Sequence, residues 1–147
     1  QGKIRDWGVS NFDTDDMNEL YETPGGEGCA TNQVLYNLTR RGPEWDLLPW
    51  LQEHEMPLMA YSPIERGRLK STGVLADLAA KHNARPYQIA LAWALRMPGN
   101  IVIPKASRAA HMRENAGARD IALDAEDLAA LDAAFPPPAR RRALEML

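Results

Sequence analysis

Four short strand-like segments, each followed by a stretch with helical character, constrain the fold of this chain more than any other feature. They cover residues 4–9, 30–36, 57–61 and 101–103. The segments begin too far apart to pair as hairpins, and strands separated by helices predict right-handed βαβ crossovers and a parallel sheet. Because the segments lack regular polar alternation, we expect both faces of the sheet to be buried. A doubly wound open sheet and part of a (β/α)₈ barrel both fit this pattern.

Helix signals fill the intervals between these segments. Met17, Leu20 and Tyr21 stand at i, i+3 and i+4 behind three aspartates, which suit a helix N-terminus. The stretch 89–95 is apolar on every side, as expected of a helix buried between neighbours. The predicted helices cover 17–21, 49–55 with Pro49 at the first position, 75–82, 86–96, a helix capped by Ser107, and a last one from the N-cap Asp124 to about Phe135.

Composition excludes several classes of protein. The chain is 45% hydrophobic and 25% charged, and its net charge of −3 gives no electrostatic reason to expect a nucleic-acid or membrane partner. The N-terminus shows no secretory leader, and the single cysteine, Cys29, suits a reducing compartment, so we expect a cytoplasmic protein. A strand predicted within a few residues of Gln1 leads us to expect a truncated N-terminus.

Polar side chains gather at the carboxyl end of each predicted strand. In a parallel barrel these ends meet on one face, so the side chains are expected to converge on one site. The alternative is that they form turns and caps at each strand separately. The four clusters are Ser10 with Asn11, Gln33 with Asn37, Tyr61 with Ser62, and Lys105 with Ser107.

The chemistry of these clusters suits an extended nicotinamide dinucleotide. Asparagine and glutamine amides pair with a carboxamide, the Tyr61 ring offers a stacking surface, and Lys105 offers a charge for phosphate. No Gly-x-Gly-x-x-Gly motif follows any strand, which disfavours the Rossmann mode of binding. No spacing of histidines and cysteines indicates a zinc site.

Four motifs, in order and over essentially the whole chain, resemble the second half of the aldo-keto reductases. Each resembles one strand from the fifth to the eighth of that family's barrel. The motifs are Gly2-Lys3-Ile4-Arg5 with Gly8-Val9-Ser10-Asn11-Phe12, then Asn32-Gln33-Val34, then Pro57-Leu58-Met59-Ala60-Tyr61-Ser62-Pro63, and finally Ile103-Pro104-Lys105-Ala106-Ser107 with Arg113-Glu114-Asn115. The resemblance implies that residues 1–147 form the C-terminal half of a parallel (β/α)₈ TIM barrel, with four β/α units and a C-terminal helix.

The resemblance also implies a set of contacts with the cofactor. Ser10, Asn11 and Gln33 would bind the nicotinamide carboxamide, and Tyr61 would stack on the nicotinamide ring. The loop 62–69, which includes Ser62, Pro63 and Ile64, would cover the pyrophosphate. At the adenosine end, Lys105 with Ala106 and Ser107 beside it would meet the 2′-phosphate, and Glu114 and Asn115 would approach the adenine.

One position departs from the pattern. His111 stands where the family often has a second phosphate-binding arginine, and a neutral imidazole binds phosphate less well than a guanidinium. We expect NADP as cofactor, with NAD as the alternative. A second interpretation of His111 is an exposed helix residue without a role.

The other basic candidates are expected to lie outside the site. His54 and His82 are expected to be surface or packing residues without an acidic partner. The run Arg140-Arg141-Arg142 is expected to be solvated, in a tail that by resemblance crosses one side of the substrate pocket.

The residues that would perform chemistry are expected elsewhere. The family's reaction resembles general acid catalysis by a tyrosine tuned by a lysine, with an aspartate and a histidine nearby, all from the first half of the barrel. No tyrosine here stands in that motif, so we predict no catalytic residue. The leading interpretation is a fragment of an NADP-dependent reductase of aldehydes and ketones, inactive by itself, whose partners are a carbonyl substrate and the missing N-terminal half. The alternatives are a non-catalytic cofactor-binding module and a homo-oligomer that associates through open sheet edges.

Overall fold

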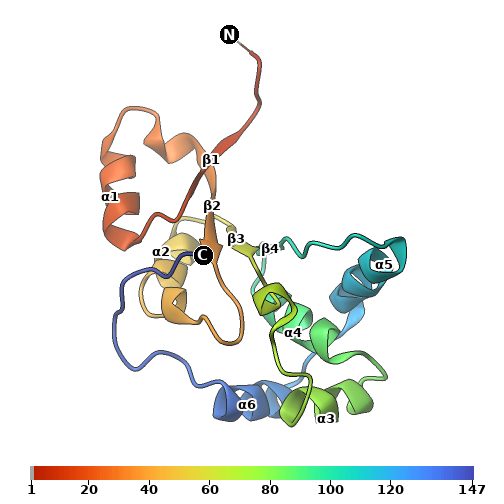
Figure 1. Ribbon diagram of the computed structural model, residues 1–147. Helices are drawn as coiled ribbons and strands as arrows, with labels where there is room; N and C mark the ends of the chain where they lie inside the picture. Colours follow the sequence, from red (N-terminus) through yellow and green to blue (C-terminus); the bar gives the residue numbers. More distant parts are fainter. Residues whose placement is uncertain (1) are drawn as a thin grey trace.

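A four-stranded parallel sheet organises the chain in the computed structural model, which describes residues 2–147. The strands lie in chain order, β1-β2-β3-β4, so each pairs with the next one along the sequence (Figure 1). Their bounds are Trp7–Ser10 for β1, Cys29–Leu35 for β2, Leu58–Tyr61 for β3 and Ile101–Val102 for β4. The predicted parallel α/β architecture is therefore confirmed.

Six α-helices connect and cover the strands. Two of them begin with reciprocal capping boxes, in which the N-cap aspartate and an aspartate three residues later accept each other's backbone N–H. These N-caps are Asp13 and Asp124, the second as predicted. The helices are α1 Thr14–Glu22, α2 Leu47–Glu53, α3 Val74–Lys81, α4 Pro86–Leu95, α5 Ala109–Gly117 and α6 Ala125–Ala134.

Three local predictions were wrong. Strand β1 begins at Trp7 rather than at residue 4. Helix α2 begins at Leu47, which places Pro49 at its third position, still within the first turn where a missing N–H costs nothing. Helix α5 has Arg108 as its N-cap and no side-chain cap, so Ser107 does not cap it.

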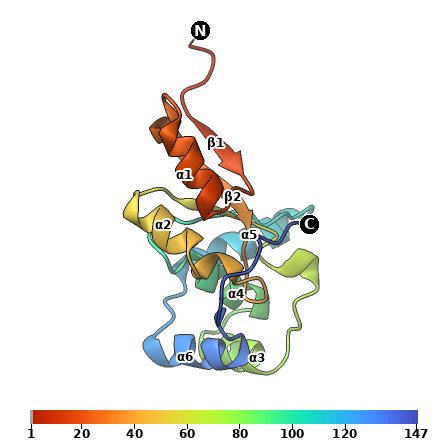
Figure 2. The ribbon, with the colours of Figure 1, turned by 90° about the vertical axis from the view of Figure 1, so that its left-hand side faces the viewer.

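The core lies between one face of the sheet and the helices. In register along this face are Asn32 and Leu58, then Val34 and Ala60, all without solvent exposure. Helix α4 contributes six consecutive buried residues, Ile89 to Ala94, which confirms that it is enclosed on every side. Helices α3 and α6 lie side by side beneath it (Figures 1 and 2).

The other face of the sheet is open. Strand β3 alternates between buried and half-buried residues, with Met59 and Tyr61 on the uncovered side, and Ile101 and Ile103 are 39% and 40% exposed. The expectation that both faces are buried was therefore wrong within residues 2–147, because helices cover only one of them. An apolar face of this kind requires a further layer.

A tail, residues 136–147, leaves α6 and returns to the carboxyl ends of the strands (Figure 1). Its arginine run is not simply solvated as predicted. Arg141 lies 2.8 Å from the carboxylates of both Asp15 and Asp46, so it ties the tail to α1 and to the start of α2. No helix among the described residues combines the length and apolarity needed to cross a membrane.

Candidate functional site

The carboxyl ends of β1, β2 and β3 bring three of the four predicted polar clusters together. Ser10 is directly opposite Gln33 in the parallel register, and Leu35 is opposite Tyr61. Just beyond β2, the buried amide of Asn37 donates hydrogen bonds of 2.9 Å to the Ser62 carbonyl and to Glu65 Oε2. The clusters therefore line one edge of the sheet, as strands in a parallel arrangement dictate.

Asn11 carries an unsatisfied acceptor at this edge. Its backbone N–H donates to the Gln33 carbonyl at 2.9 Å, and Ser10 Oγ donates to the same oxygen at 3.0 Å. Asn11 adopts the left-handed conformation, with φ of 57°, which asparagine tolerates better than most residues. Its Oδ1 is buried and accepts no hydrogen bond from residues 2–147. Since such an oxygen costs about 1–3 kcal/mol, the site favours a ligand that donates an N–H.

The neighbouring amides differ in how they are satisfied. Gln33 Nε2 lies 3.0 Å from the sulfur of Met59, a weak acceptor, so this amide is available for a better partner. Asn32 points to the helix face instead, where its Nδ2 donates to the Phe12 carbonyl at 2.8 Å. Asn32 therefore fixes the turn after β1, and Gln33 faces the open side.

The loop 62–69 has an unusual backbone; it is called the cofactor loop here after the role that the family resemblance implies for it. Ser62, Glu65, Arg66 and Gly67 all have φ between 49° and 78°, and only the last is a glycine. Non-glycine residues in this region cost about 1–3 kcal/mol each and persist only when the surroundings hold them. Asn37 supplies part of that hold, together with Arg40, whose Nη2 lies 3.0 Å from Glu65 Oε1.

The ion pair at Glu65 is reflected in its acidity. Burial by itself raises the pKa of this carboxyl, but the hydrogen bonds from Arg40 and Asn37 outweigh burial and bring the pKa below its ordinary value. Glu65 is therefore charged at neutral pH and holds both of its partners.

A cavity of about 340 Å³ lies between the cofactor loop and the segment that follows β4. Its charged lining residues are cationic, Arg66 and Lys105, so the cavity suits an anion such as a phosphate. Arg66 lies within the predicted loop 62–69 but was not predicted individually, because nothing in the local sequence pattern indicates its left-handed backbone. The lining residues are Ser62, Pro63, Ile64, Arg66, Gly67, Ile103 and Lys105.

Of the residues predicted for the adenosine end, Lys105 lines this cavity and the others do not. Ser107 and His111 are exposed, Ala106 is half-buried, and Glu114 and Asn115 are half-buried on α5. Glu114 pairs with Arg85 at 3.2 Å, and its carbonyl accepts a hydrogen bond from Gln88 Nε2 at 2.8 Å. Helix α4 therefore sets the position of this part of α5.

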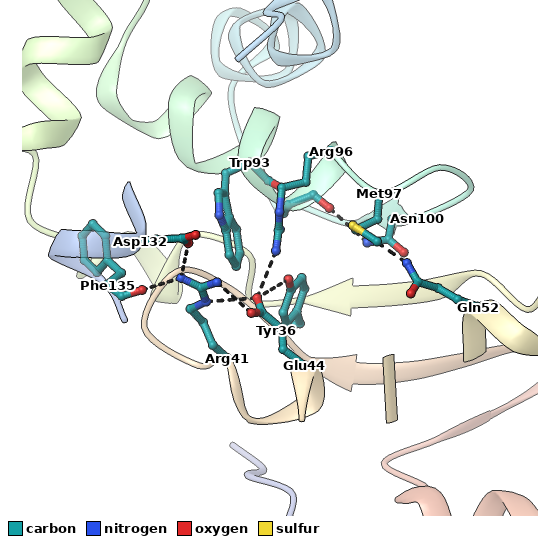
Figure 3. A network of polar contacts seen from close by, with 11 residues as sticks. Tyr36, Arg41, Glu44, Gln52, Trp93, Arg96, Met97, Asn100, Asp132 and Phe135 are labelled. Carbon is teal, nitrogen blue, oxygen red and sulfur yellow. Dashed lines mark hydrogen bonds and ion pairs between the residues drawn. The ribbon is translucent and has the colours of Figure 1, made fainter. Parts of the chain in front are cut away.

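A buried polar network supports the end of β2 from the helix side (Figure 3). Glu44 is its centre: Oε1 accepts hydrogen bonds from Tyr36 Oη at 2.7 Å and from Arg96 at 3.0 Å, and both oxygens accept from Arg41. Arg96 also stacks on the Trp93 ring, with its guanidinium carbon 3.8 Å from the ring centre. The network holds Tyr36, and with it the chain that leads to Asn37.

Comparison with known proteins decides the family. Residues 1–135 match the sequence profile described as the aldo/keto reductase family. The chain belongs to the aldo/keto reductase family. The family membership predicted from the four motifs is therefore confirmed.

Individual members of the family cover the chain almost completely. The chain is 49% identical to methylglyoxal reductase YeaE of Escherichia coli K12, matching 100% of this chain and 54% of that protein. It is 35% identical to methylglyoxal reductase DkgB of E. coli O157:H7 over 90% of this chain and 49% of that protein. The chain therefore spans about half the length of these curated relatives.

A solved structure agrees equally well. The crystal structure of an aldo-keto reductase from Klebsiella pneumoniae in complex with NADPH superimposes with a TM-score of 0.95 at 49% identity, and covers 99% of this chain and 53% of the other. A second structure of an aldo/keto reductase from that organism contains NADP and acetate, with the same identity and TM-score. This partial aldo/keto reductase barrel thus has close structural homologues that bind the expected cofactor.

One prediction about histidines was wrong in this family member. His82 does have an acidic partner: its Nε2 lies 2.6 Å from Oδ2 of Asp127, which is 1% exposed, and Lys81 Nζ lies 2.6 Å from the other oxygen. His82 and Asp127 are 45 residues apart in sequence. Their contact joins the end of α3 to α6 and does not involve the carboxyl ends of the strands. His54 is a packing residue as predicted, since its ring stacks on Trp50 at 3.7 Å.

Proposed function

We propose that residues 1–147 are the C-terminal half of an aldo/keto reductase barrel and supply the binding site for NADP. Two observations favour this half: the four motifs follow the order of the later strands, and polar residues and a cationic cavity occupy the carboxyl ends. The open face, with Ile101 and Ile103 exposed, is the surface on which the N-terminal half would pack. Both sheet edges, β1 and β4, would then gain a neighbouring strand.

The residues present fit the cofactor. The observation that carries the proposal is the buried, unsatisfied Oδ1 of Asn11 beside Gln33, because a carboxamide NH₂ donates the hydrogen bond that this oxygen lacks. Tyr61 is half-buried on the open side of β3, where a flat ring can stack on it. Arg66 and Lys105 give the cavity beneath the cofactor loop the charge that a phosphate requires.

The chain's own residues bind and orient rather than transfer protons. Asn11 and Gln33 would hold the carboxamide and so orient the nicotinamide ring, and Tyr61 would cover one face of that ring. The bound reduced cofactor supplies the hydride that converts a carbonyl into an alcohol. The proton for the alcohol oxygen comes, in this proposal, from the N-terminal half. The relatives named above indicate small aldehydes such as methylglyoxal as substrates.

The test is made on the full-length protein. NADPH binding is measured by fluorescence, and NADPH consumption is followed with methylglyoxal. We expect both, and we expect Asn11→Ala to weaken NADPH binding about tenfold, which corresponds to loss of one hydrogen bond of about 1.4 kcal/mol. Asn100→Ala, a turn residue at the opposite end of the sheet, is the matched control. A full-length protein that neither binds nor consumes NADPH would overturn the proposal.

A further inference from the structure

Arg40 lies between two carboxylates that come from segments far apart in the chain. Its Nη2 contacts Glu65 Oε1, in the cofactor loop, at 3.0 Å, and its Nη1 contacts Glu145 Oε2, in the tail. The two contacts span 25 and 105 residues of sequence. One guanidinium therefore bridges the cofactor loop and the tail.

The position of Arg40 is fixed from below. Its backbone N–H donates to the Asn37 carbonyl at 2.9 Å, in a tight turn after β2. The Asn37 side chain is 1% exposed, and it reaches the second oxygen of Glu65 as well as the Ser62 carbonyl. Each oxygen of Glu65 thus has a donor from this one turn. The left-handed residues of the cofactor loop are held by this arrangement, since two adjacent ones, Glu65 and Arg66, would otherwise relax.

The tail has its own sequence of anchors. Arg141 binds Asp15 and Asp46 near its beginning, Glu145 binds Arg40, and the Leu147 N–H points to Tyr61 Oη at 3.4 Å. Beyond Arg141, Arg40 is the main electrostatic contact that directs the tail toward Tyr61. Tyr61, the residue proposed to stack on the nicotinamide, therefore contacts the end of the tail and directly precedes the cofactor loop.

We propose that Arg40 is a positioning residue that couples the seating of the tail, at Glu145, to the conformation of the cofactor loop, at Glu65. The inference rests on the function proposed above. Arginine suits the task because its planar fork presents separate N–H groups to two acceptors, whereas the lysine ammonium is a point charge that holds one of them well. The coupling is reciprocal: a ligand that seats the tail slows cofactor release, and a bound cofactor favours the seated tail.

The experiment compares variants of the full-length protein by two readouts. The first is the rate at which NADPH dissociates, measured by stopped-flow fluorescence. The second is hydrogen exchange of the amides of residues 62–69 without cofactor. The variants are Arg40→Gln, Arg40→Lys and Glu145→Ala, with Arg140→Ala as the matched control from the same tail. Arg140 is exposed and has no ion pair among the described residues.

We expect Glu145→Ala, a change in the tail, to speed NADPH dissociation about two- to fivefold, the range expected for losing one partly exposed ion pair. It should also increase exchange in the cofactor loop. Arg40→Gln should act in the same direction, and adding Glu145→Ala to it should change little further. Arg40→Lys should reproduce only part of the wild-type protection, and Arg140→Ala should match wild type in both readouts.

Two results would overturn the coupling. One is unchanged NADPH release and loop exchange in Glu145→Ala; the other is fully additive effects in the double variant. Glu145 is 44% exposed, so its replacement leaves the fold intact even where Arg40→Gln does not. A full-length protein that fails to bind NADPH contradicts the proposed function instead, and the exchange experiment without cofactor still tests Arg40.

Discussion

Replacing Glu44 with glutamine tests whether the buried network is a principal support of this half of the barrel. The substitution keeps the shape of the side chain and removes the one negative charge that faces two guanidinium groups. Arg41 retains Asp132 and the Phe135 carbonyl, but Arg96 loses its carboxylate and retains the Trp93 carbonyl and ring. The new amide NH₂ also meets a guanidinium donor wherever it replaces an oxygen.

The size of the effect follows from burial. Glu44 is 12% exposed, Arg41 6% and Arg96 19%, so the pair with Arg41 is effectively buried. Removing one member of a buried pair typically costs about 3–5 kcal/mol, because the remaining charge has no partner. We place Glu44→Gln at the lower end, about 3 kcal/mol, since Arg41 keeps a second carboxylate. For a domain of 150–250 residues, a loss of about 3 kcal/mol lowers the melting temperature by roughly 6–12 °C.

The assay is urea unfolding of the full-length protein, followed by tryptophan fluorescence, because Trp93 lies in the network. Glu53→Gln is the control: it makes the same chemical change on the exposed side of α2, and Glu53 has no ion pair within residues 2–147. We expect the control within about 0.5 kcal/mol of wild type. If Glu44→Gln unfolds at the same urea concentration as Glu53→Gln, the network is not the support described here.

Three further predictions concern separate parts of the molecule. Lys105→Met should weaken binding of NADPH about tenfold, as expected for loss of one charge-assisted contact, and should leave NADH binding within about twofold; equal losses for both in a fluorescence titration would contradict a role at the 2′-phosphate. Burial by itself raises the pKa of Asp127, but the hydrogen bonds from Lys81 and His82 outweigh burial and bring the pKa to about 2, against an ordinary 3.8. Its stabilising contribution is therefore complete above pH 4 and lost as pH falls toward 2, and Asp127→Asn should flatten the acid side of the unfolding profile; an unchanged slope would count against this. Asn37→Ala should lower stability by about 1–3 kcal/mol and expose the cofactor loop to protease, whereas an unaltered cleavage rate would show that the loop holds itself.

The sequence predicts β2, β3 and the first and last helices well because their signals are local. Apolar segments of the right length mark β2 and β3, and aspartates three residues apart mark the starts of α1 and α6. The convergence of Ser10, Gln33 and Tyr61 follows from parallel pairing once the strands are placed. The assignment of these residues to parts of a cofactor depended on resemblance to a family.

The contacts that the sequence did not reveal join residues with no local relation. His82 meets Asp127 only because α3 packs beside α6, and Arg141 meets Asp15 only because the tail returns across α1. No glycine at positions 65 and 66 signals the left-handed backbone of Glu65 and Arg66. The contacts that hold Glu65 come from a different turn, so the local sequence does not reveal them. Burial on both sheet faces was expected because the composition of the strands indicates covered faces. It does not indicate whether the elements that cover them lie within residues 2–147.

The sheet order has a consequence for how such a protein is made. Each strand pairs with the one synthesised just before it, so β1 to β4 can assemble progressively as the chain leaves the ribosome, with crossovers of modest length. The outer edge of β4 is different, because in the closed barrel proposed above β4 is the last strand and its neighbour is the first strand to be synthesised. Closure of that barrel would therefore wait until β4 has left the ribosome. Until then the earlier strands would carry an unpaired edge and an apolar interior, which would make the nascent chain more prone to aggregation than the closed barrel.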